Sequence, residues 1–344
     1  SIFVFDAFRG GSNKFNGLSS IFSFNSIILE KIEVFNNFYS DALAPLVKLF
    51  LFLIPLFAVI AVEMIIVSKD KKLKIQDTSI GKLRSSEDTD YADLFYFSIH
   101  LLTYIFPVII TILSLGFQNA DSSLQEMIRN FYKSIIPLPN GEFNLLVLLI
   151  ITILLTDFAN YIKHVIDHKT FLWELHEFHH SAPEMNIFAN YRDTYLSVLS
   201  GVLFLLPLYS FTSLLLLESL SEGGYFIFFV YSFWIFLSKT FNVIGHSSLK
   251  IIYPKPFSYV FMSPSLHWIH HSKNPNHFDK NFGFIFSLWD RIFGTYLDET
   301  NIEDIPGYGV SKSRYNMHHP LYSYFVMPYK KLFKKILYIA NLQK

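Results

Sequence analysis

The 344-residue chain contains no cysteine, so it has no thiol to form a disulfide framework, a thiolate zinc site, an iron–sulfur cluster or a nucleophilic cysteine. Charge is scarce as well: 16% of the residues are charged, against about 25% in ordinary soluble domains. The 28 Lys and Arg residues equal the 28 Asp and Glu residues in number. A protein that follows a nucleic-acid backbone needs a basic surplus, so no nucleic-acid partner is expected.

Apolar residues are abundant instead, at 51% of the chain with 18% aromatic. A hydrocarbon core of about 30 Å needs about 20 apolar residues in a helix. Five windows meet this requirement, and they predict an all-α integral membrane protein with about five transmembrane helices and a cytosolic, histidine-rich cap. The windows are 44–68, 94–116, 143–163, 194–218 and 224–245.

The same windows divide the chain into four parts. Residues 1–43 form an N-terminal segment with an interfacial helix, and residues 44–245 form the transmembrane bundle, which includes a loop at 164–193. Residues 246–300 form the cap. Residues 301–344 mix apolar residues with lysines, a pattern typical of an amphipathic helix on a membrane surface.

The distribution of Lys and Arg predicts the orientation of the chain. The side that receives the 164–193 loop and the C-terminus carries 22 of the 28 basic residues. Basic loops remain in the cytoplasm, so we expect a multi-pass protein of a bacterial inner membrane or the endoplasmic reticulum, with its C-terminus and histidine clusters in the cytoplasm.

Most of the 13 histidines fall into clusters at this cytoplasmic side. Positions i, i+3 and i+4 of a helix share one face, so each cluster can direct its imidazoles at one point. Neutral imidazole binds first-row metals well, and nine such ligands exceed what one ion accepts. The pattern therefore predicts two metal ions. The expected ligands are His164, His168, His176, His179, His180, His246, His267, His270 and His271, with His277 as a possible auxiliary ligand.

Polar residues near these clusters are candidates to support the ligands. Asp157 and Tyr161 share a helical stripe with His164 and His168. A ligating imidazole usually donates its second N–H to a carboxylate or carbonyl, and Asp157 is the expected partner. Weaker candidates for the same task follow the last cluster, at Asp279, Asn281 and Asp290. We expect Glu63 and His100, which have no evident partner cluster, to be structural.

The ordered motifs H-x3-H, H-x2-H-H and H-x2-H-H resemble the three histidine boxes of the fatty acid hydroxylase and sterol desaturase superfamily. The segment Asp279-Lys280-Asn281-Phe282-Gly283 and the following WDRIFGTY at 289–296 are similar as well. The likeness covers about residues 157–296. The lead-in Ser263-Pro264-Ser265-Leu266 looks nearest to the alkylglycerol monooxygenase branch and its bacterial relatives.

The resemblance implies a non-haem di-iron centre that uses O2 and two external electrons to hydroxylate or desaturate a lipid such as a fatty acyl chain, sterol or alkylglycerol. It also implies the nine ligand assignments. The sequence shows no flavin or nicotinamide glycine motif, so the expected electron donor is a separate reductase or tetrahydrobiopterin.

Two other functions remain open at this stage. A histidine-lined metal transporter or sensor without catalysis would place its ligands along a pathway through the membrane. A metal-dependent hydrolase would use the same ions to activate water.

Overall fold

The computed structural model describes residues 49–50, 52–85, 91–102, 134, 142–221, 225–310, 315 and 319–342. The expected N-terminal segment 1–43 and most of the second apolar window lie outside these residues. Nearly all of the described residues belong to one compact unit, Leu51–His100 with Ala120–Lys344. Its regular elements are helices, and the described part of the chain has no β-strand beyond two isolated bridges. For these residues the predicted all-helical character is confirmed.

Helix α6 (Glu142–Lys169) sets the position of the first histidine box. Its apolar run contains neither Pro nor Gly, so nothing interrupts the helix. At 28 residues it is about 42 Å long, which exceeds the hydrocarbon thickness of about 30 Å. The expected span 143–163 therefore covers only part of this helix, which continues through Lys169. His164 and His168 lie in the last helical turns and not in a loop.

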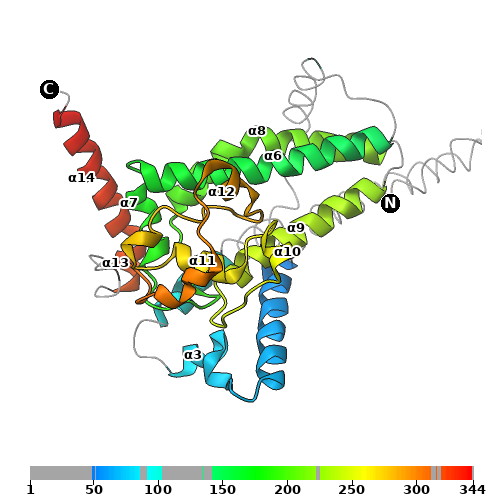
Figure 1. Ribbon diagram of the computed structural model, residues 1–344. Helices are drawn as coiled ribbons and strands as arrows, with labels where there is room; N and C mark the ends of the chain where they lie inside the picture. The colour runs from blue at the N-terminus through cyan, green and yellow to red at the C-terminus, as the bar shows by residue number, and fades with distance from the viewer. Residues whose placement is uncertain are drawn as a thin grey trace, which may run out of the picture. The chain divides into compact units, whose positions relative to one another are not determined.

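Helices α8 (Tyr195–Ser221) and α9 (Tyr225–Gly245) correspond to the fourth and fifth apolar windows. In Figure 1, α6 and α8 lie side by side. Leu145, Leu149, Leu215 and Ile227 are buried in one apolar cluster that joins all three helices. The cluster lies near the start of α6, far from the histidines at its end.

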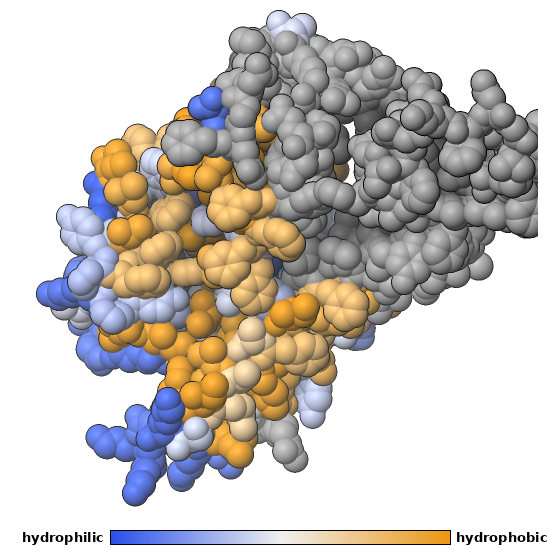
Figure 2. Space-filling view, turned by 90° about the vertical axis from the view of Figure 1, so that its right-hand side faces the viewer, coloured by the Kyte–Doolittle hydropathy of each residue, from blue (hydrophilic) through white to orange (hydrophobic). Residues whose placement is uncertain are grey.

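Two helices of the described chain, Phe52–Lys69 and Asn144–Lys169, are long and apolar enough to cross a membrane. The remaining expected spans stay predictions. Large apolar side chains of α6 are exposed, including Val147, Ile150 and Leu155. Figure 2 shows apolar side chains gathered over a broad face of the molecule. A continuous apolar surface of this kind is typical of contact with lipid or another apolar partner.

Short helices gather near the histidine ends of α6 and α9 (Figure 1). They are α7 (Trp173–His176), η2 (His179–Ser181), η3 (Ala189–Tyr191), α10 (Lys255–Ser258), α11 (Pro264–His270), η4 (Pro275–His277), α12 (Leu288–Phe293) and η5 (Glu299–Asp304). Before them in the chain come η1 (Ile75–Asp77) and α3 (Ser79–Ser85), after the helix Phe52–Lys69.

The C-terminal tail folds as α13 (Pro320–Phe325) and α14 (Met327–Leu342). Helix α14 packs on α7, and Lys331 contacts the buried carboxylate of Glu177 in the second histidine box. Tyr96 and Tyr324 pack against Phe178 of the same box. The tail and the helix over residues 91–102 therefore support the segment that carries His176, His179 and His180.

Candidate metal centre

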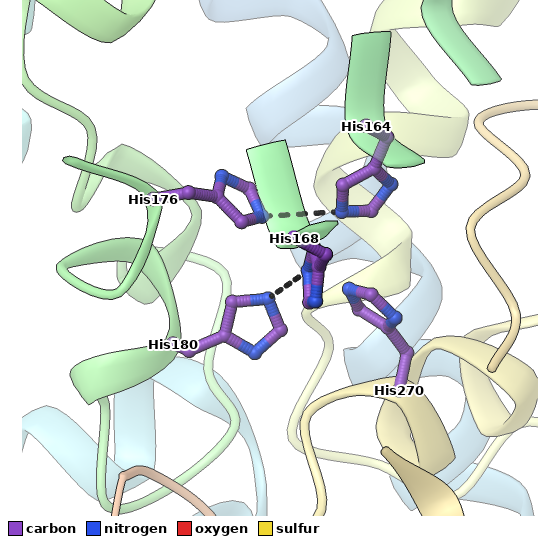
Figure 3. Close-up of side chains that lie close together, drawn as sticks. All are labelled: His164, His168, His176, His180 and His270. Carbon is purple, nitrogen blue, oxygen red and sulfur yellow. Dashed lines mark hydrogen bonds between the residues drawn. The ribbon is translucent and has the colours of Figure 1, made fainter. Parts of the chain in front are cut away.

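The nine histidines of the three boxes and His246 meet in two groups. The five-histidine group consists of His164, His168, His176, His180 and His270; the four-histidine group consists of His179, His246, His267 and His271. Within each group the potential ligand atoms all lie within 4.8 Å of one another. Figure 3 shows the rings of the five-histidine group directed toward a common centre from α6, α7, η2 and α11.

Local structure explains how separate segments reach these centres. His164 and His168 occupy one face of α6, and His246 directly follows the end of α9. Helix α11 begins at Pro264, with the Ser263 side chain accepting a hydrogen bond from Leu266 N. Such a cap fixes the first helical turn, so the third box falls at the end of this short helix.

Neighbouring histidines in the sequence are assigned to different groups. His179 belongs to the four-histidine group and His180 to the five-histidine group, and His271 and His270 divide in the same way. Each His-His pair therefore contributes one ring to each centre. The boxes seen in the sequence do not correspond to the groups seen in space.

The spacing of the nitrogen atoms suits metal coordination. In the five-histidine group, Nε2 of His164 lies 3.1 Å from Nε2 of His176, and the His168–His180 distance is also 3.1 Å. In the four-histidine group, Nε2 of His246 lies 3.3 Å from that of His179 and 3.2 Å from that of His267. Two nitrogens bound to one ion at about 2.1 Å stand about 3.0 Å apart at a right angle and about 3.4 Å apart at the tetrahedral angle.

Backbone carbonyls fix the tautomer of three rings. The Nδ1–H groups of His164 and His270 donate to the carbonyl oxygens of Phe282 and Lys280, at 2.8 Å and 2.7 Å. Nδ1–H of His246 donates to Asn242 O at 3.3 Å. In a neutral imidazole the other nitrogen then carries the lone pair. Nε2 of His270 is buried without a hydrogen-bond partner, as expected for an atom placed to bind a cation.

Burial keeps the rings outside the long helices neutral. It lowers the pKa of His246 and His270 to about 4 and holds the pKa of His179 and His271 well below the usual value for histidine. Neighbouring imidazoles add to this lowering because two positive rings would repel each other. Neutral imidazole is the form that binds metal, so the ligand set suits first-row ions such as iron, copper or zinc.

The segment 279–283 supplies the carbonyls that orient two of these rings. Asp279 and Asn281 both have positive φ, at 61° and 57°. This conformation is uncommon for residues other than glycine, although Asn and Asp tolerate it best. The backbone is thereby turned so that Lys280 O and Phe282 O accept from His270 and His164.

Two of the predicted support residues hold this segment in place. Asp290 accepts hydrogen bonds from Phe282 N at 2.7 Å and Gly283 N at 2.8 Å. The Asn281 side chain donates to Leu266 O and accepts from Leu297 N. Both side chains are fully buried. They act on the ligands through the backbone and not by contact with the rings.

Asp279 lies nearer to a ring. Its Oδ1 is 3.8 Å from Nδ1 of His168, and it also pairs with Lys169. Asp167 has a similar position, with Oδ2 3.9 Å from Nδ1 of His176. Asp167 was not predicted as a support residue, although its place one residue before His168 could have indicated this role.

Asp157 does not bond a histidine ring, contrary to expectation. Its two oxygens accept from Ile285 N, Phe286 N and Trp289 Nε1. Tyr161 Oη lies 3.0 Å from Thr295 Oγ1. Both residues are therefore used to fasten the 282–296 segment to α6. The stripe on α6 continues to the metal centre, but only its histidines reach the centre.

Glu63 has the structural role that was expected of it, and the structure shows its partners. It is almost fully buried, and it accepts from Ser79 N and Oγ and from Ser247 Oγ and Ser248 N. It thereby ties the helix Phe52–Lys69 to the turn that follows His246 of the four-histidine group. A carboxylate within an apolar window was the signal for this role.

A second buried anchor joins the helix over residues 91–102 to the second box. Arg192 pairs with Asp93 and donates to Ser181 Oγ at 3.0 Å, next to His180. Asn186 Nδ2 donates to the same aspartate at 3.0 Å. Neither side of this ion pair was recognised in the sequence, because a single Asp and a single Arg separated by about 100 residues form no local pattern.

The other described histidines lie outside both groups. His277 is buried in η4 with Nε2 3.5 Å from Asn274 Nδ2, and its place as an auxiliary ligand is not supported by this position. His100 Nε2 donates to Asp193 O at 3.2 Å, in line with the expected structural role.

A cavity of about 640 Å³ opens between α6, α8 and α9 and reaches the histidines. Five histidines line it: His179, His246 and His267 of the four-histidine group, and His164 and His176 of the five-histidine group. Ile153, Leu205, Tyr231 and Trp234 line an apolar part of it. The volume is in the ordinary range for small-molecule sites.

Comparisons with known proteins agree with the histidine pattern. The model of the fatty acid hydroxylase family matches residues 149–295. This range contains all nine converging histidines together with Asp157, Tyr161, Asp279, Asn281 and Asp290. The resemblance to the fatty acid hydroxylase superfamily is confirmed.

Similar curated proteins are alkylglycerol monooxygenases. The one from Caenorhabditis elegans is 30% identical over 165 residues, which cover 45% of this chain and 28% of the relative. The one from Homo sapiens is 27% identical over 166 residues, covering 48% and 32%, and the one from Danio rerio is 28% identical with the same coverage. The chain thus spans about a third of the length of the relatives it matches. No solved structure matches.

Proposed function

We propose that this protein, which matches the fatty acid hydroxylase family over residues 149–295 and brings its histidines into two groups, is a membrane-bound non-haem di-iron oxygenase that hydroxylates a lipid. The observation that supports this proposal most directly is the convergence of nine imidazoles beside an apolar cavity, with Nε2–Nε2 distances of 3.1–3.3 Å. Desaturation of the same lipid is the alternative outcome of the same first step.

Iron bound in the two groups would activate O2 against an alkyl C–H bond, which side-chain acids, bases and nucleophiles cannot break. The overall reaction takes up O2, two electrons and two protons and yields the hydroxylated lipid and water. The two electrons come from outside the chain, and we propose a separate reductase or tetrahydrobiopterin as their source. The lipid resembles those of the named relatives in having a hydrocarbon chain.

The protein's own part is to hold and orient. Phe282 O and Lys280 O fix the rings of His164 and His270, and the buried Asp290 fixes the segment that carries these carbonyls. The apolar lining of the cavity excludes water from the reacting carbon. Rings of both histidine groups line the cavity, so substrate in the cavity would reach both groups.

We further propose that α8, α9 and the second apolar window cross the membrane together with Phe52–Lys69 and α6. The histidines and the C-terminus then lie on the cytoplasmic side, and α14 lies on the membrane surface with Lys330, Lys334 and Lys335 near anionic headgroups. A transport pathway would need ligands at several depths, whereas both histidine groups lie at one end of α6 and α9.

The test combines metal analysis, O2 uptake and lipid mass spectrometry. Purified full-length protein is expected to hold about two iron ions per chain and to consume O2 only with lipid and an electron donor. Cells that contain the protein should accumulate a lipid heavier by one oxygen atom, or lighter by two hydrogen atoms for desaturation. Iron-loaded protein that hydrolyses a lipid without O2, or that carries metal across vesicles without O2 uptake, would contradict the proposal.

A further inference from the structure

The cavity-facing side of α9 carries a lysine between its apolar part and the metal centre. Tyr231, Ile235, Lys239, Asn242 and His246 follow one another at spacings of three or four residues, and all line the cavity. Residues at such spacings share one helical face. Lys239 precedes His246 by seven residues, which corresponds to about 10 Å along the helix axis.

Lys239 differs from the other lysine of the cavity in its partners. Lys163 donates to Asp167 Oδ2 at 2.5 Å. Lys239 forms neither a hydrogen bond nor an ion pair with any residue in the part of the chain that the structure describes. Lys239 lines the cavity and is exposed.

An unpaired ammonium within an apolar bundle is unfavourable. Moving a charge out of water costs several kcal/mol in practice unless an opposite charge compensates it. Ionisable residues inside membrane bundles accordingly face a cavity and mark a ligand or ion pathway. Three carboxylates, Asp157, Asp167 and Asp193, also line the cavity, but none of them forms an ion pair with Lys239. The cavity therefore leaves space for a compensating anion at Lys239, and Ser238 and Asn242 add neutral hydrogen-bonding groups beside it.

The apolar residues that line the cavity indicate what the rest of the ligand is made of. Tyr231, Trp234 and Ile235 lie on the far side of Lys239 from the histidines, and Leu205 and Ile153 line the cavity from α8 and α6. This apolar part suits a hydrocarbon chain. The volume of about 640 Å³ favours one such chain over the two chains of a bilayer phospholipid.

We propose that the cavity binds a single-chain lipid with an anionic headgroup, a carboxylate or a phosphate, and that the Lys239 ammonium pairs with that headgroup. The proposal deepens the proposed function, on which it rests for the view that the cavity holds the substrate. It assigns Lys239 as the residue that selects charged over neutral lipids.

The test measures binding and does not depend on turnover. Metal-loaded full-length protein in a neutral detergent at pH 8 is titrated with palmitate, hexadecyl phosphate and hexadecanol, which share the chain and differ in the headgroup. We expect at least one anionic lipid to bind about tenfold more tightly than the alcohol, since a charge-assisted hydrogen bond contributes about this much. The two anions distinguish a carboxylate from a phosphate site.

Variants assign the preference to the lysine. Lys239→Met is expected to lose the preference while hexadecanol affinity and metal content remain, and Lys239→Arg to keep it. Lys334→Met removes an exposed lysine of α14 and should leave all three affinities unchanged. Equal wild-type affinities for the three lipids, or an undiminished preference in Lys239→Met with metal content retained, would overturn the inference.

Parallel O2-uptake measurements on the same preparations separate this inference from the proposed function. A charge preference that depends on Lys239 without any O2 uptake would overturn the oxygenase and leave the anionic lipid site in place. O2 uptake driven equally by charged and neutral lipids, with no difference in binding, would overturn the lipid site alone.

Discussion

The imidazole rings of His180 and His271 stack, with centroids 4.2 Å apart and planes 20° apart. The two rings belong to different histidine groups, so the groups are in direct contact through these two side chains. Each ring is buried, and neither can shift without moving into the neighbouring group. The two centres therefore form one structural unit.

Removing one ring from either group should remove metal from that group. His270→Ala and His179→Ala are each expected to lower bound iron from about two ions per chain to about one or fewer and to abolish O2 uptake, because each group loses a buried ligand. Metal analysis after purification from the membrane fraction measures the effect. His277→Ala, which changes a buried histidine outside both groups, should retain its iron. Full activity in either ligand variant would count against the di-iron assignment.

Asp290 should control metal affinity without touching a ring. In Asp290→Asn an NH2 group replaces one of the two carboxylate oxygens and cannot accept a hydrogen bond, so the bond from either Phe282 N or Gly283 N is lost and the carbonyl of Phe282 is held less firmly. We expect the metal affinity to fall by about 10- to 100-fold. This is the usual effect of removing a residue that orients a metal ligand. Competition with a chelator measures it, with the exposed Asp304→Asn as control. An unchanged affinity would show that Phe282 O is held by other contacts.

Gly283 should not tolerate a side chain. A Cβ atom there would lie 2.5 Å from Phe286 O and 2.8 Å from Asp290 Oδ2, so Gly283→Ala must displace the 282–286 segment. Overpacking of this kind costs about 1–3 kcal/mol, and bound metal should fall as well. Thermal unfolding and metal content test this. Gly201→Ala is the matched change, since its Cβ would meet its nearest atom at 3.5 Å, an ordinary contact.

Glu63 should stabilise the turn after His246. Glu63→Gln weakens four buried hydrogen bonds from Ser79, Ser247 and Ser248, and we expect a loss of about 1–3 kcal/mol together with weaker binding of the ion held by the four-histidine group. The exposed Glu184→Gln should have little effect on the unfolding midpoint. If both variants unfold at the same temperature, the hydrogen bonds of Glu63 contribute nothing measurable.

Metal-free protein should lose stability in mild acid. Burial lowers the pKa of His246 and His270 to about 4, whereas histidine in the unfolded chain titrates near about 6.5. Below pH 6.5 the unfolded state therefore binds more protons than the folded state. The free energy of unfolding is highest above that pH and declines as the pH falls toward 4. Unfolding midpoints of chelator-treated protein between pH 7 and 4 measure this decline. Restored metal should shift it to lower pH, because bound metal competes with protons.

The sequence predicted which histidines come together better than it predicted how they divide into two groups and which residues hold them in place. Spacings of three and four residues were enough to predict that His164 and His168, or His267 and His271, point the same way, because helical geometry is local. The division of His179 and His180 between two centres was not predictable, since it depends on how η2 packs against α9 and α11. The same holds for Arg192 and Asp93, whose pairing exists only in the folded chain.

Asp157 illustrates a different limit. Its place on the histidine stripe was correct, yet its partners are Trp289 and two backbone N–H groups. A backbone donor leaves no mark in the sequence, so a side-chain pattern could not reveal it. Hydropathy detects where an apolar run ends and not where a helix ends: the expected span stops at residue 163, whereas α6 continues for six further residues through Lys169.

The division of the two His-His pairs also limits how the chain length can vary. Successive rings in each pair are joined by a single peptide unit, so one residue inserted before His179 or before His270 would rotate both members of the pair and withdraw one ring from each histidine group in one step. The lengths of the 168–179 and 246–271 segments are thus constrained by both histidine groups at once. Insertions in this chain should be tolerated in its surface loops and at its termini, and rejected within these two segments.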